Sequence, residues 1–481
     1  QGLKLPEWRT ELQHHASGCY SATSLIKHLN RVTENALIRS EIFAALSARL
    51  TGHKPDSLRQ GWYNLMFNQF HDVLCGCSIR EAYEDARVQL DEARSIAARA
   101  ENAALQKISW AVDTVGGIPG RLRSKESHFR LWELDGLGTP VVVFNPHPFT
   151  AKAQIQVYGA VKYATDESDV ETPIQTVRAS RTNGEDKWDS LFVAEVPPMG
   201  YRLYWIYLDE KGRASHERDR ALRTPDDNDA AASGLTITET SIGNRHLSAR
   251  FDPKTGALVS LMRRDSGRET LSAPALPRLV DIEHADTWAH RVFTFEKLRE
   301  GFENARFEIL ERGPVRAKLC VTTTACASTL VQDFILYADA DQLEVEARLD
   351  MRERFRMLKL CFPVAAQSPK ARAEISYGVI ERECDGCEET GHRWMQLGGE
   401  TGGLAVLNDG KYSFSAAGNE LRLTVANTSI YADHFGQRNR DDRCVHADMG
   451  AQEFRYALVP HDGSWTKAGL ARHGELFNRP L

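Results

Sequence analysis

The densest group of side chains able to do chemistry lies at residues 67–76, which read Phe-Asn-Gln-Phe-His-Asp-Val-Leu-Cys-Gly. This segment sets His71 directly beside Asp72. A neutral imidazole is the commonest metal ligand among side chains, and a neighbouring carboxylate can bind metal or accept hydrogen bonds from sugar hydroxyls. The segment is one histidine short of the known metal motifs, and an isolated His-Asp pair is more often a surface feature or a satisfied buried pair. On the pattern alone, both interpretations of His71 and Asp72 stay open.

Two further groups contain histidine. His14 and His15 beside Glu11 could bind metal, but a histidine pair near a chain end is more often solvated. Residues 286–290, Asp-Thr-Trp-Ala-His, place an indole among polar groups. Tryptophan faces stack on sugars, although packing in a core is commoner. The sequence contains no Walker loop, dinucleotide fingerprint, nucleophile elbow or His-Glu-x-x-His motif.

The cysteines indicate the redox state of the compartment more clearly than they indicate a metal site. The chain has nine, which is sparse for 481 residues and odd in number. Free thiols in a reducing, cytoplasmic compartment are therefore expected, with no structural disulfide. Cys384 and Cys387 form a lone C-x-x-C without a second pair at zinc-finger spacing, and Cys75 and Cys77 lie too close together for a structural zinc site. A turn is favoured at each pair.

The overall composition is that of a globular protein with real cores. Hydrophobic residues make up 42% and charged residues 26% of the chain, and the net charge is −6. Because there is no basic excess to neutralise phosphates, nucleic acid is not an expected partner. No uncharged apolar run is long enough to span a bilayer, so we expect no membrane segment, and no signal peptide is visible.

The first part of the chain reads as helices. Apolar residues recur at three- and four-residue steps, which predicts three helices in an antiparallel bundle over about residues 16–111. Ser21 or Thr23 would cap the first helix and Gly52 would end it, whereas Ser78 and Glu81 have the spacing of a capping box for the third. The expected buried faces are Leu25, Ile26, Leu29, Val32, Ala36, Leu37, Phe43, Ala44 and Leu50 in the first helix; Leu58, Trp62, Leu65 and Met66 in the second; and Tyr83, Ala86, Leu90, Ala93, Ala97, Ala100 and Leu105 in the third.

Strand patterns replace the helices after the breakers at 116–120, Gly-Gly-Ile-Pro-Gly. Short runs rich in β-branched and aromatic residues are bounded by turn residues, as at 141–144, 153–158, 191–196 and 201–207. We therefore expect an α+β multidomain chain: a helical bundle at 1–115, a β-sandwich domain at 116–208, an exposed linker or loop at 209–233, and a large C-terminal β-sandwich domain at 234–481. No helix longer than a turn or two is expected in the β part.

This organisation places the His71 segment at an edge. The apolar face of the second helix is already filled, so the bundle core does not need His71. Gly76 and the expected cap at Ser78 force a turn directly after it. We therefore expect His71 and Asp72 on an exposed edge of the bundle, with Phe67 or Phe70 unusually exposed beside them.

Several segments together resemble glycoside hydrolase family 38. Residues 11–21 (Glu-Leu-Gln-His-His-Ala-Ser-Gly-Cys-Tyr-Ser), then 27–34 and Glu41, look like the start of the helical domain of that family, although Thr10 stands where a glycine is expected. Residues 68–76 resemble its Gln-x-His-Asp motif. The later matches are 143–146 (Val-Phe-Asn-Pro), 196–201 (Val-Pro-Pro-Met-Gly-Tyr) and the strand pair at 244–256. They follow the family order and extend over essentially the whole chain.

The resemblance carries implications for the fold and the site. Family 38 proteins are known as retaining α-mannosidases with one active-site zinc ion, and their β domains include a galactose-mutarotase-like supersandwich. His71 would be the zinc ligand of the helical domain, and Asp72 would lie beside it, facing metal or sugar. The other zinc ligands, the nucleophilic aspartate and the general acid belong to an N-terminal (β/α)7 barrel, for which we expect no counterpart here.

The expected function follows from this resemblance. The chain would be the C-terminal portion of a zinc-dependent α-mannosidase that hydrolyses terminal α-linked mannose from oligosaccharides. It would supply one zinc ligand and walls of the site, and would be inactive without the barrel domain. The rival is a non-enzymatic carbohydrate-binding or scaffold β protein in which His71 is structural. The sequence leaves open the preferred linkage and the oligomeric state, including a homo-oligomer.

Overall fold

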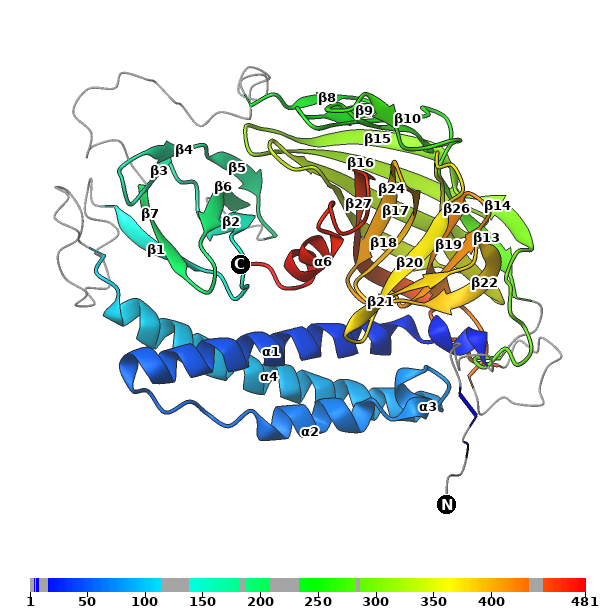
Figure 1. Ribbon diagram of the computed structural model, residues 1–481, viewed down its shortest axis with the longest axis horizontal. Helices are drawn as coiled ribbons and strands as arrows, with labels where there is room; N and C mark the ends of the chain where they lie inside the picture. The colour runs from blue at the N-terminus through cyan, green and yellow to red at the C-terminus, as the bar shows by residue number, and fades with distance from the viewer. Residues whose placement is uncertain are drawn as a thin grey trace.

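A computed structural model describes Lys4 and residues 6–7, 16–114, 138–180, 187–207, 233–282, 286–431 and 444–481. Figure 1 shows two long helices that run beneath both a small and a large β unit. The expected order, helices followed by antiparallel β-sandwiches, is confirmed. The domain boundaries remain a prediction, and nearly all of the expected linker at 209–233 lies outside the described residues. In the part that the structure describes, no helix is long and apolar enough to cross a membrane.

The helical unit is a three-helix bundle with a short extra turn. Consecutive long helices run antiparallel (Figure 1). Gly61 lets α2 (Arg59–Asn68) approach the first helix closely, because a Cβ atom there would lie 2.8 Å from Cδ2 of Leu37. The elements are η1 (Ser17–Tyr20), α1 (Ser24–Thr51), α2 (Arg59–Asn68), α3 (His71–Leu74) and α4 (Arg80–Ala111).

The residues of the bundle core are all among those that the helical spacing predicts to be buried. It is made of Ile26, Leu29, Leu37, Leu58, Leu65, Tyr83, Ala86, Leu90, Ala97 and Ala100. Three expected core residues are instead exposed: Leu25 by 53%, Leu50 by 64% and Met66 by 53%. Leu25 and Met66 each adjoin a buried residue of the same helix, and successive helical positions are rotated by about 100°. Leu50 lies in the last turn of α1.

The expected helix caps are partly wrong. Gly52 ends α1 in the left-handed conformation as predicted. Helix α4 begins at Arg80, and no side chain caps it. The N–H group of Ser78 instead donates a hydrogen bond to the Tyr83 hydroxyl at 2.7 Å, so the capping box with Glu81 does not form.

Helix α1 is capped by a residue from the far end of the chain. Oδ1 of Asp448 accepts hydrogen bonds from the N–H group and the hydroxyl of Ser24, at 2.8 and 3.1 Å. Oδ2 of Asp448 accepts one from the N–H group of Asn427 at 3.0 Å. Thr23 donates to the carbonyl of Gly76 instead of capping the helix, and Ser21 bonds the side chain of Asn427. A carboxylate at this helix end is also favoured by the helix dipole.

The small β unit contains two packed sheets. One has the order β1-β7-β3-β4 and the other β2-β6-β5. Phe192 and Tyr204 lie in the core between them, whereas Trp205 faces Val112 at the end of α4. The strands are β1 (Thr139–Phe144), β2 (Ala151–Tyr158), β3 (Tyr163–Asp166), β4 (Glu171–Thr172), β5 (Gln175–Arg178), β6 (Trp188–Val196) and β7 (Tyr201–Tyr207).

The large β unit packs three sheets around one extended core. The sheets have the orders β12-β11-β10-β9-β8, β14-β13-β19-β26-β25-β22 and β15-β16-β17-β18-β27-β24-β23-β20-β21. All three contribute to the same apolar cluster. The strands are β8 (Thr236–Thr238), β9 (Ser241–Gly243), β10 (Leu247–Phe251), β11 (Leu258–Arg263), β12 (Arg268–Glu269), β13 (Leu276–Asp281), β14 (Leu298–Gly301), β15 (Glu303–Arg312), β16 (Arg316–Ala325), β17 (Ser328–Tyr337), β18 (Leu343–Met351), β19 (Arg356–Pro363), β20 (Lys370–Ile375), β21 (Gly378–Arg382), β22 (Asp385–Thr390), β23 (Trp394–Gly399), β24 (Gly402–Asn408), β25 (Ser413–Ala417), β26 (Glu420–Asn427) and β27 (Gly450–Asp462).

Helix α6 (Leu470–Asn478) corrects the expectation that no helix longer than a turn or two occurs in the β part. It covers an outward apolar face of the largest sheet, where Leu470 and Phe477 pack with Trp394. Gly474 allows the close approach, because a Cβ atom there would lie 2.9 Å from Cδ1 of Trp394. A nine-residue helix with so few large apolar residues gives a weak periodic signal.

One ion pair lies wholly inside the large β unit. The side chains of Lys359 and Glu388 are in contact and have no exposed surface. Glu388 also accepts hydrogen bonds from Ser413 at 2.6 Å and Thr424 at 2.5 Å. Burial alone would raise the pKa of Glu388, but Lys359 and the two hydroxyls together lower it. The charge is therefore fully partnered, as a buried carboxylate must be.

Lys359→Met should destabilise the large β unit strongly. It leaves the Glu388 carboxylate buried without its cation, at a cost of about 3–5 kcal/mol. The matched control is Lys370→Met in the exposed Lys370–Glu381 pair, which should cost about 0–1 kcal/mol. Guanidinium denaturation followed by tryptophan fluorescence measures both. Equal effects of the two substitutions would contradict the analysis.

A second charge cluster joins the small and large β units. Asp339 contacts Lys152 of β2 and Arg245, and Nε2 of His246 lies 3.2 Å from its Oδ1. Partial burial alone would raise the pKa of Asp339, but hydrogen bonds from Lys152 and His246 lower it to about 2. The carboxylate therefore links β2 of the small unit to loops of the large unit.

Asp339→Asn should reduce stability in a pH-dependent way. The folded pKa of Asp339, about 2, lies below its ordinary value of 3.8. The group therefore stabilises the protein above about pH 4, and this stabilisation is lost as the pH falls from 4 toward 2. Thermal unfolding of the wild type and the variant at pH 7, 5, 4 and 3 should show a difference that shrinks with acidification. A difference that is constant over this range would refute the assignment.

Candidate functional site

The His71 turn, residues 69–78, connects α2 to α4 at one end of the bundle. Helix α2 ends at Asn68, Phe70 is extended, and the N–H groups of Val73 and Leu74 donate to the Phe70 carbonyl at 2.9 Å. The His71 side chain is 71% exposed and that of Asp72 is 38% exposed, with Nε2 of His71 3.6 Å from Oδ1 of Asp72. Both side chains therefore reach the surface, where another group can contact them.

A row of exposed apolar side chains, the apolar rim, precedes His71 in the chain. It consists of Tyr63, Met66, Phe67 and Phe70, which are exposed by 47%, 53%, 70% and 55%. The Phe70 ring lies against the imidazole, with centroids 4.2 Å apart. The expected exposure of Phe67 and Phe70 is present. Such a cluster of exposed aromatic side chains is unusual on a protein surface and typical of an interaction site.

Polar contacts fix the turn from behind. Gln69 donates to Oδ1 of Asn30 at 3.0 Å, and Asn30 donates to the Tyr412 hydroxyl at 3.2 Å. Asn68 donates to Oε1 of Gln89 at 2.8 Å. The start of the turn is thereby tied to α1, to α4 and, through Tyr412, to the large β unit.

The end of the turn packs on the start of α1. Gly76 has a φ of +82°, and a Cβ atom there would overlap the carbonyl of Ala22. Lys27 is buried and donates to the carbonyls of Ala22, Leu74 and Cys75 at 2.6, 3.1 and 3.2 Å. Burial lowers the pKa of Lys27 to about 8. The ammonium group thus joins the turn to α1.

Three thiols lie where the turn meets η1, two of them in the turn itself. Cys19 of η1 forms hydrogen bonds with Cys75 and Cys77, and these bonds raise the pKa of the Cys19 thiol. The bond with Cys19, aided by Lys27, lowers the pKa of Cys75 below its usual value. Sγ of Cys77 lies 3.6 Å from both the backbone oxygen and Oδ1 of Asp72. Sequence reasoning missed Cys19, because no local pattern links it to residues this distant in the chain.

The segment at 286–290 serves a structural purpose. Oδ1 of Asp286 accepts hydrogen bonds from the N–H groups of Trp288 and Ala289, at 3.0 and 3.1 Å. The Trp288 ring is half-buried and stacks on His290, with centroids 5.3 Å apart. The Trp288 carbonyl accepts a hydrogen bond from Gly18 at 3.2 Å. This loop therefore positions η1.

The remaining sequence candidates are not brought to the His71 turn. The turn expected at Cys384 and Cys387 is wrong: Cys384 directly precedes β22 and Cys387 lies within it, at a bulge between Asp385 and Glu388 where the N–H group of Cys387 donates to Asp385. His14 and His15, like Glu11, lie outside the described residues. Within the described ranges, no three histidine, cysteine, aspartate or glutamate side chains converge as a metal site.

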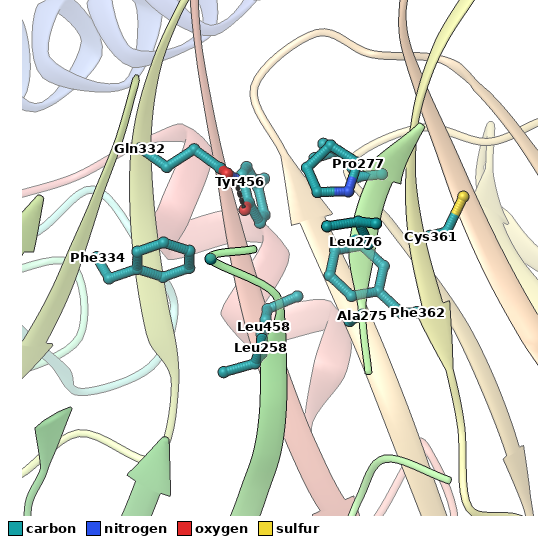
Figure 2. Close-up of a pocket in the computed structure, with 12 residues that line it drawn as sticks. Leu258, Ala275, Leu276, Pro277, Gln332, Phe334, Cys361, Phe362, Tyr456 and Leu458 are labelled. Carbon is teal, nitrogen blue, oxygen red and sulfur yellow. Dashed lines mark hydrogen bonds between the residues drawn. The ribbon is translucent and has the colours of Figure 1, made fainter. Parts of the chain in front are cut away.

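An internal cavity in the large β unit is too small for a sugar. Its volume is about 20 Å³, room for about one water molecule. Figure 2 shows its mainly apolar lining, where Gln332 donates to the Tyr456 hydroxyl at 2.6 Å. The polar pair is thereby satisfied. This cavity does not compete with the His71 turn as a sugar site.

Comparisons with known proteins identify the helical and large β units. Residues 14–108 match the alpha mannosidase middle domain, and residues 242–435 match the C-terminal domain of glycosyl hydrolases family 38. The chain carries these two domains of family 38. The His71 turn therefore belongs to the middle domain of that family, and β9 to β26 belong to its C-terminal domain.

Individual relatives match nearly the whole chain. Alpha-mannosidase G of Dictyostelium discoideum is 24% identical over 99% of this chain, and human alpha-mannosidase 2C1 is 24% identical over 97%. The match covers 43% and 40% of their own lengths, so the chain spans less than half of these relatives. A crystal structure of a family 38 protein from Enterococcus faecalis has the same fold, with a TM-score of 0.73, 14% identity, and coverage of 96% of this chain and 59% of that one.

Gly76→Ala should destabilise the protein by more than the cost of placing alanine in a left-handed backbone conformation. The control is Gly159→Ala, where φ is +87° and a Cβ atom would meet nothing within 4 Å. The control should cost about 1–2 kcal/mol, and Gly76→Ala should cost more because the turn must also move away from Ala22. Melting temperatures of both variants test this. A smaller loss for Gly76→Ala would show that the packing against Ala22 is loose.

Proposed function

We propose that this chain is the C-terminal portion of a retaining, zinc-dependent α-mannosidase that removes terminal α-linked mannose from oligosaccharides. The observation that carries the proposal is an exposed His71–Asp72 pair on the domain that matches the mannosidase middle domain. The relatives are named alpha-mannosidases, which supports the substrate class. The sparse, odd set of cysteines favours a cytoplasmic setting.

The donor set fits zinc as one part of a complete site. His71 presents a largely exposed imidazole, and Asp72 has a carboxylate oxygen 3.6 Å from it. Structural and catalytic zinc sites need at least three protein ligands. Since no three such side chains converge among the described residues, the other ligands would come from the barrel domain that the family resemblance implies. When bound, zinc would hold sugar hydroxyls and favour distortion of the ring.

Hydrolysis with retention requires two carboxyl groups about 5 Å apart, one acting as nucleophile and one as general acid. The family resemblance assigns both to the barrel domain. This chain would contribute His71 as a zinc ligand, Asp72 as a contact to metal or sugar, and the apolar rim as a surface for the barrel. We therefore propose that the 481-residue chain alone is inactive.

The alternative function is a non-enzymatic carbohydrate-binding or scaffold protein in which His71 is structural. The exposure of His71 argues against a structural role, since its side chain is not needed to fill the bundle core. Turnover of an aryl α-mannoside by the purified 481-residue chain would contradict the proposal that the nucleophile and the general acid belong to the barrel domain. Binding of mannose oligosaccharides without turnover by the complete protein would favour the alternative.

In the complete protein, His71→Ala should remove most of the bound zinc and most of the activity on aryl α-mannosides. Its melting temperature should stay nearly unchanged, because substitution of an exposed side chain usually costs less than about 0.5 kcal/mol. The measurements are zinc content by mass spectrometry, initial rates and thermal unfolding.

The control is His53→Ala, which follows the opposite end of α1 and should retain both zinc and activity. If His71→Ala melts the fold and spares zinc, the histidine is structural and the assignment of the ligand fails.

A further inference from the structure

The three thiols where the His71 turn meets η1 form a cluster that the proposed function does not use. Cys19 comes from η1, whereas Cys75 and Cys77 follow α3. The Cys19 thiol interacts with both of the others, and this interaction raises its pKa. All three are free thiols. A cluster of thiols built from two separate segments is a candidate for reversible covalent chemistry.

Contacts that involve no sulfur hold the two segments together. The hydroxyl of Thr23 donates to the Gly76 carbonyl at 3.1 Å, and Gly76 packs on Ala22 without room for a Cβ atom. Lys27 adds its bonds to Leu74 and Cys75 at 3.1 and 3.2 Å. The fold therefore holds the segment of Cys19 beside the segment of Cys75 without any bond between sulfur atoms. Such preorganisation favours an intramolecular disulfide over a mixed one.

Burial distinguishes the three thiols. Cys75 is half-buried, whereas Cys19 and Cys77 are exposed by only 5% and 4%. Sγ of Cys77 also faces Asp72 at 3.6 Å. A reagent from solvent therefore reaches Cys75 first, and Cys19 is the thiol best placed to respond. We propose that Cys75 and Cys19 are a redox-active dithiol, a modification site that reacts with low-molecular-weight disulfides such as oxidised glutathione.

The reaction consists of two thiol–disulfide exchanges. The Cys75 thiol loses its proton, and its sulfur attacks one sulfur of the small disulfide. The S–S bond of the reagent breaks, and the first small thiol leaves and takes up a proton. Cys19 then loses its proton and attacks the Cys75 sulfur, which releases the second small thiol in the same way. Two protein thiols are oxidised and one small disulfide is reduced to two thiols, so atoms and electrons balance.

The product would covalently join the first turn of the bundle to the His71 turn. Because this chemistry depends only on the described thiols, it is independent of the mannosidase proposal. It succeeds or fails without zinc, a sugar substrate or any further domain.

The test uses the full 481-residue chain, reduced and then freed of reductant. The protein is incubated with oxidised glutathione, denatured, alkylated without reduction, digested and mapped by mass spectrometry. We expect a linked peptide pair containing Cys19 and Cys75, lighter by two hydrogens than the two thiol peptides, and its loss after treatment with dithiothreitol. Cys77→Ser should retain the link and Cys75→Ser should abolish it. The exposed Cys326 is the matched control, since Cys326→Ser should leave the link unchanged.

Three results on the wild-type chain would overturn the proposal: a stable glutathione adduct on Cys75 without a link, a link between Cys19 and Cys77, or no change at either residue. These results come from the peptide map of the wild-type chain, so the test does not depend on whether any variant folds. Circular dichroism before and after oxidation checks that the link forms in the folded protein.

Discussion

The helical unit depends on a single carboxylate that belongs to the large β unit, that of Asp448. Asp448 of the large β unit accepts hydrogen bonds at the first turn of α1, where the chain's own Thr23 turns away to bond Gly76. Burial raises the pKa of Asp448, which opposes its charge, while Lys411 and the bonds from Ser24 and Asn427 favour it. The β unit therefore fixes where α1 begins, and the bundle and the β unit are energetically one body at this point.

From this capped end, the position of His71 follows through a short chain of contacts. The cap holds residues 21–24, these hold Gly76 through Ala22 and Thr23, and Lys27 binds the carbonyls just before it. On the other side of the turn, Gln69 is tied to Asn30 and thence to Tyr412 of the β unit. A surface histidine is thus held by a buried polar network, which is what a ligand of fixed geometry requires.

The sequence predicted the features that arise from local periodicity and missed those that arise through space. Helical spacing identified Ile26, Leu37 and Leu90 as core, and the exposed location of His71 followed from the filled face of α2. The cap by Asp448 and the approach of Cys19 to Cys75 join residues far apart in the chain, so no window of sequence contains them. Helix α6 was missed because its nine residues make too short a pattern, although the face of Trp394 that it covers needs a partner.

The two sides of the His71 turn differ in a way that bears on its use. Behind the turn, most polar atoms are paired and the backbone is fixed; in front, Phe67 and Phe70 present apolar rings to water beside an imidazole. Leaving two aromatic side chains exposed forgoes about 1.5–3 kcal/mol each of burial, and a fold selected only for its own stability has no reason to gather them at one rigid point. The exposure of the rim is explained if another surface covers it. A covered site also excludes water, which strengthens a contact between metal and sugar. The exposure of the rim and the rigidity behind it therefore support the same proposal, a site that this chain shapes and another domain completes.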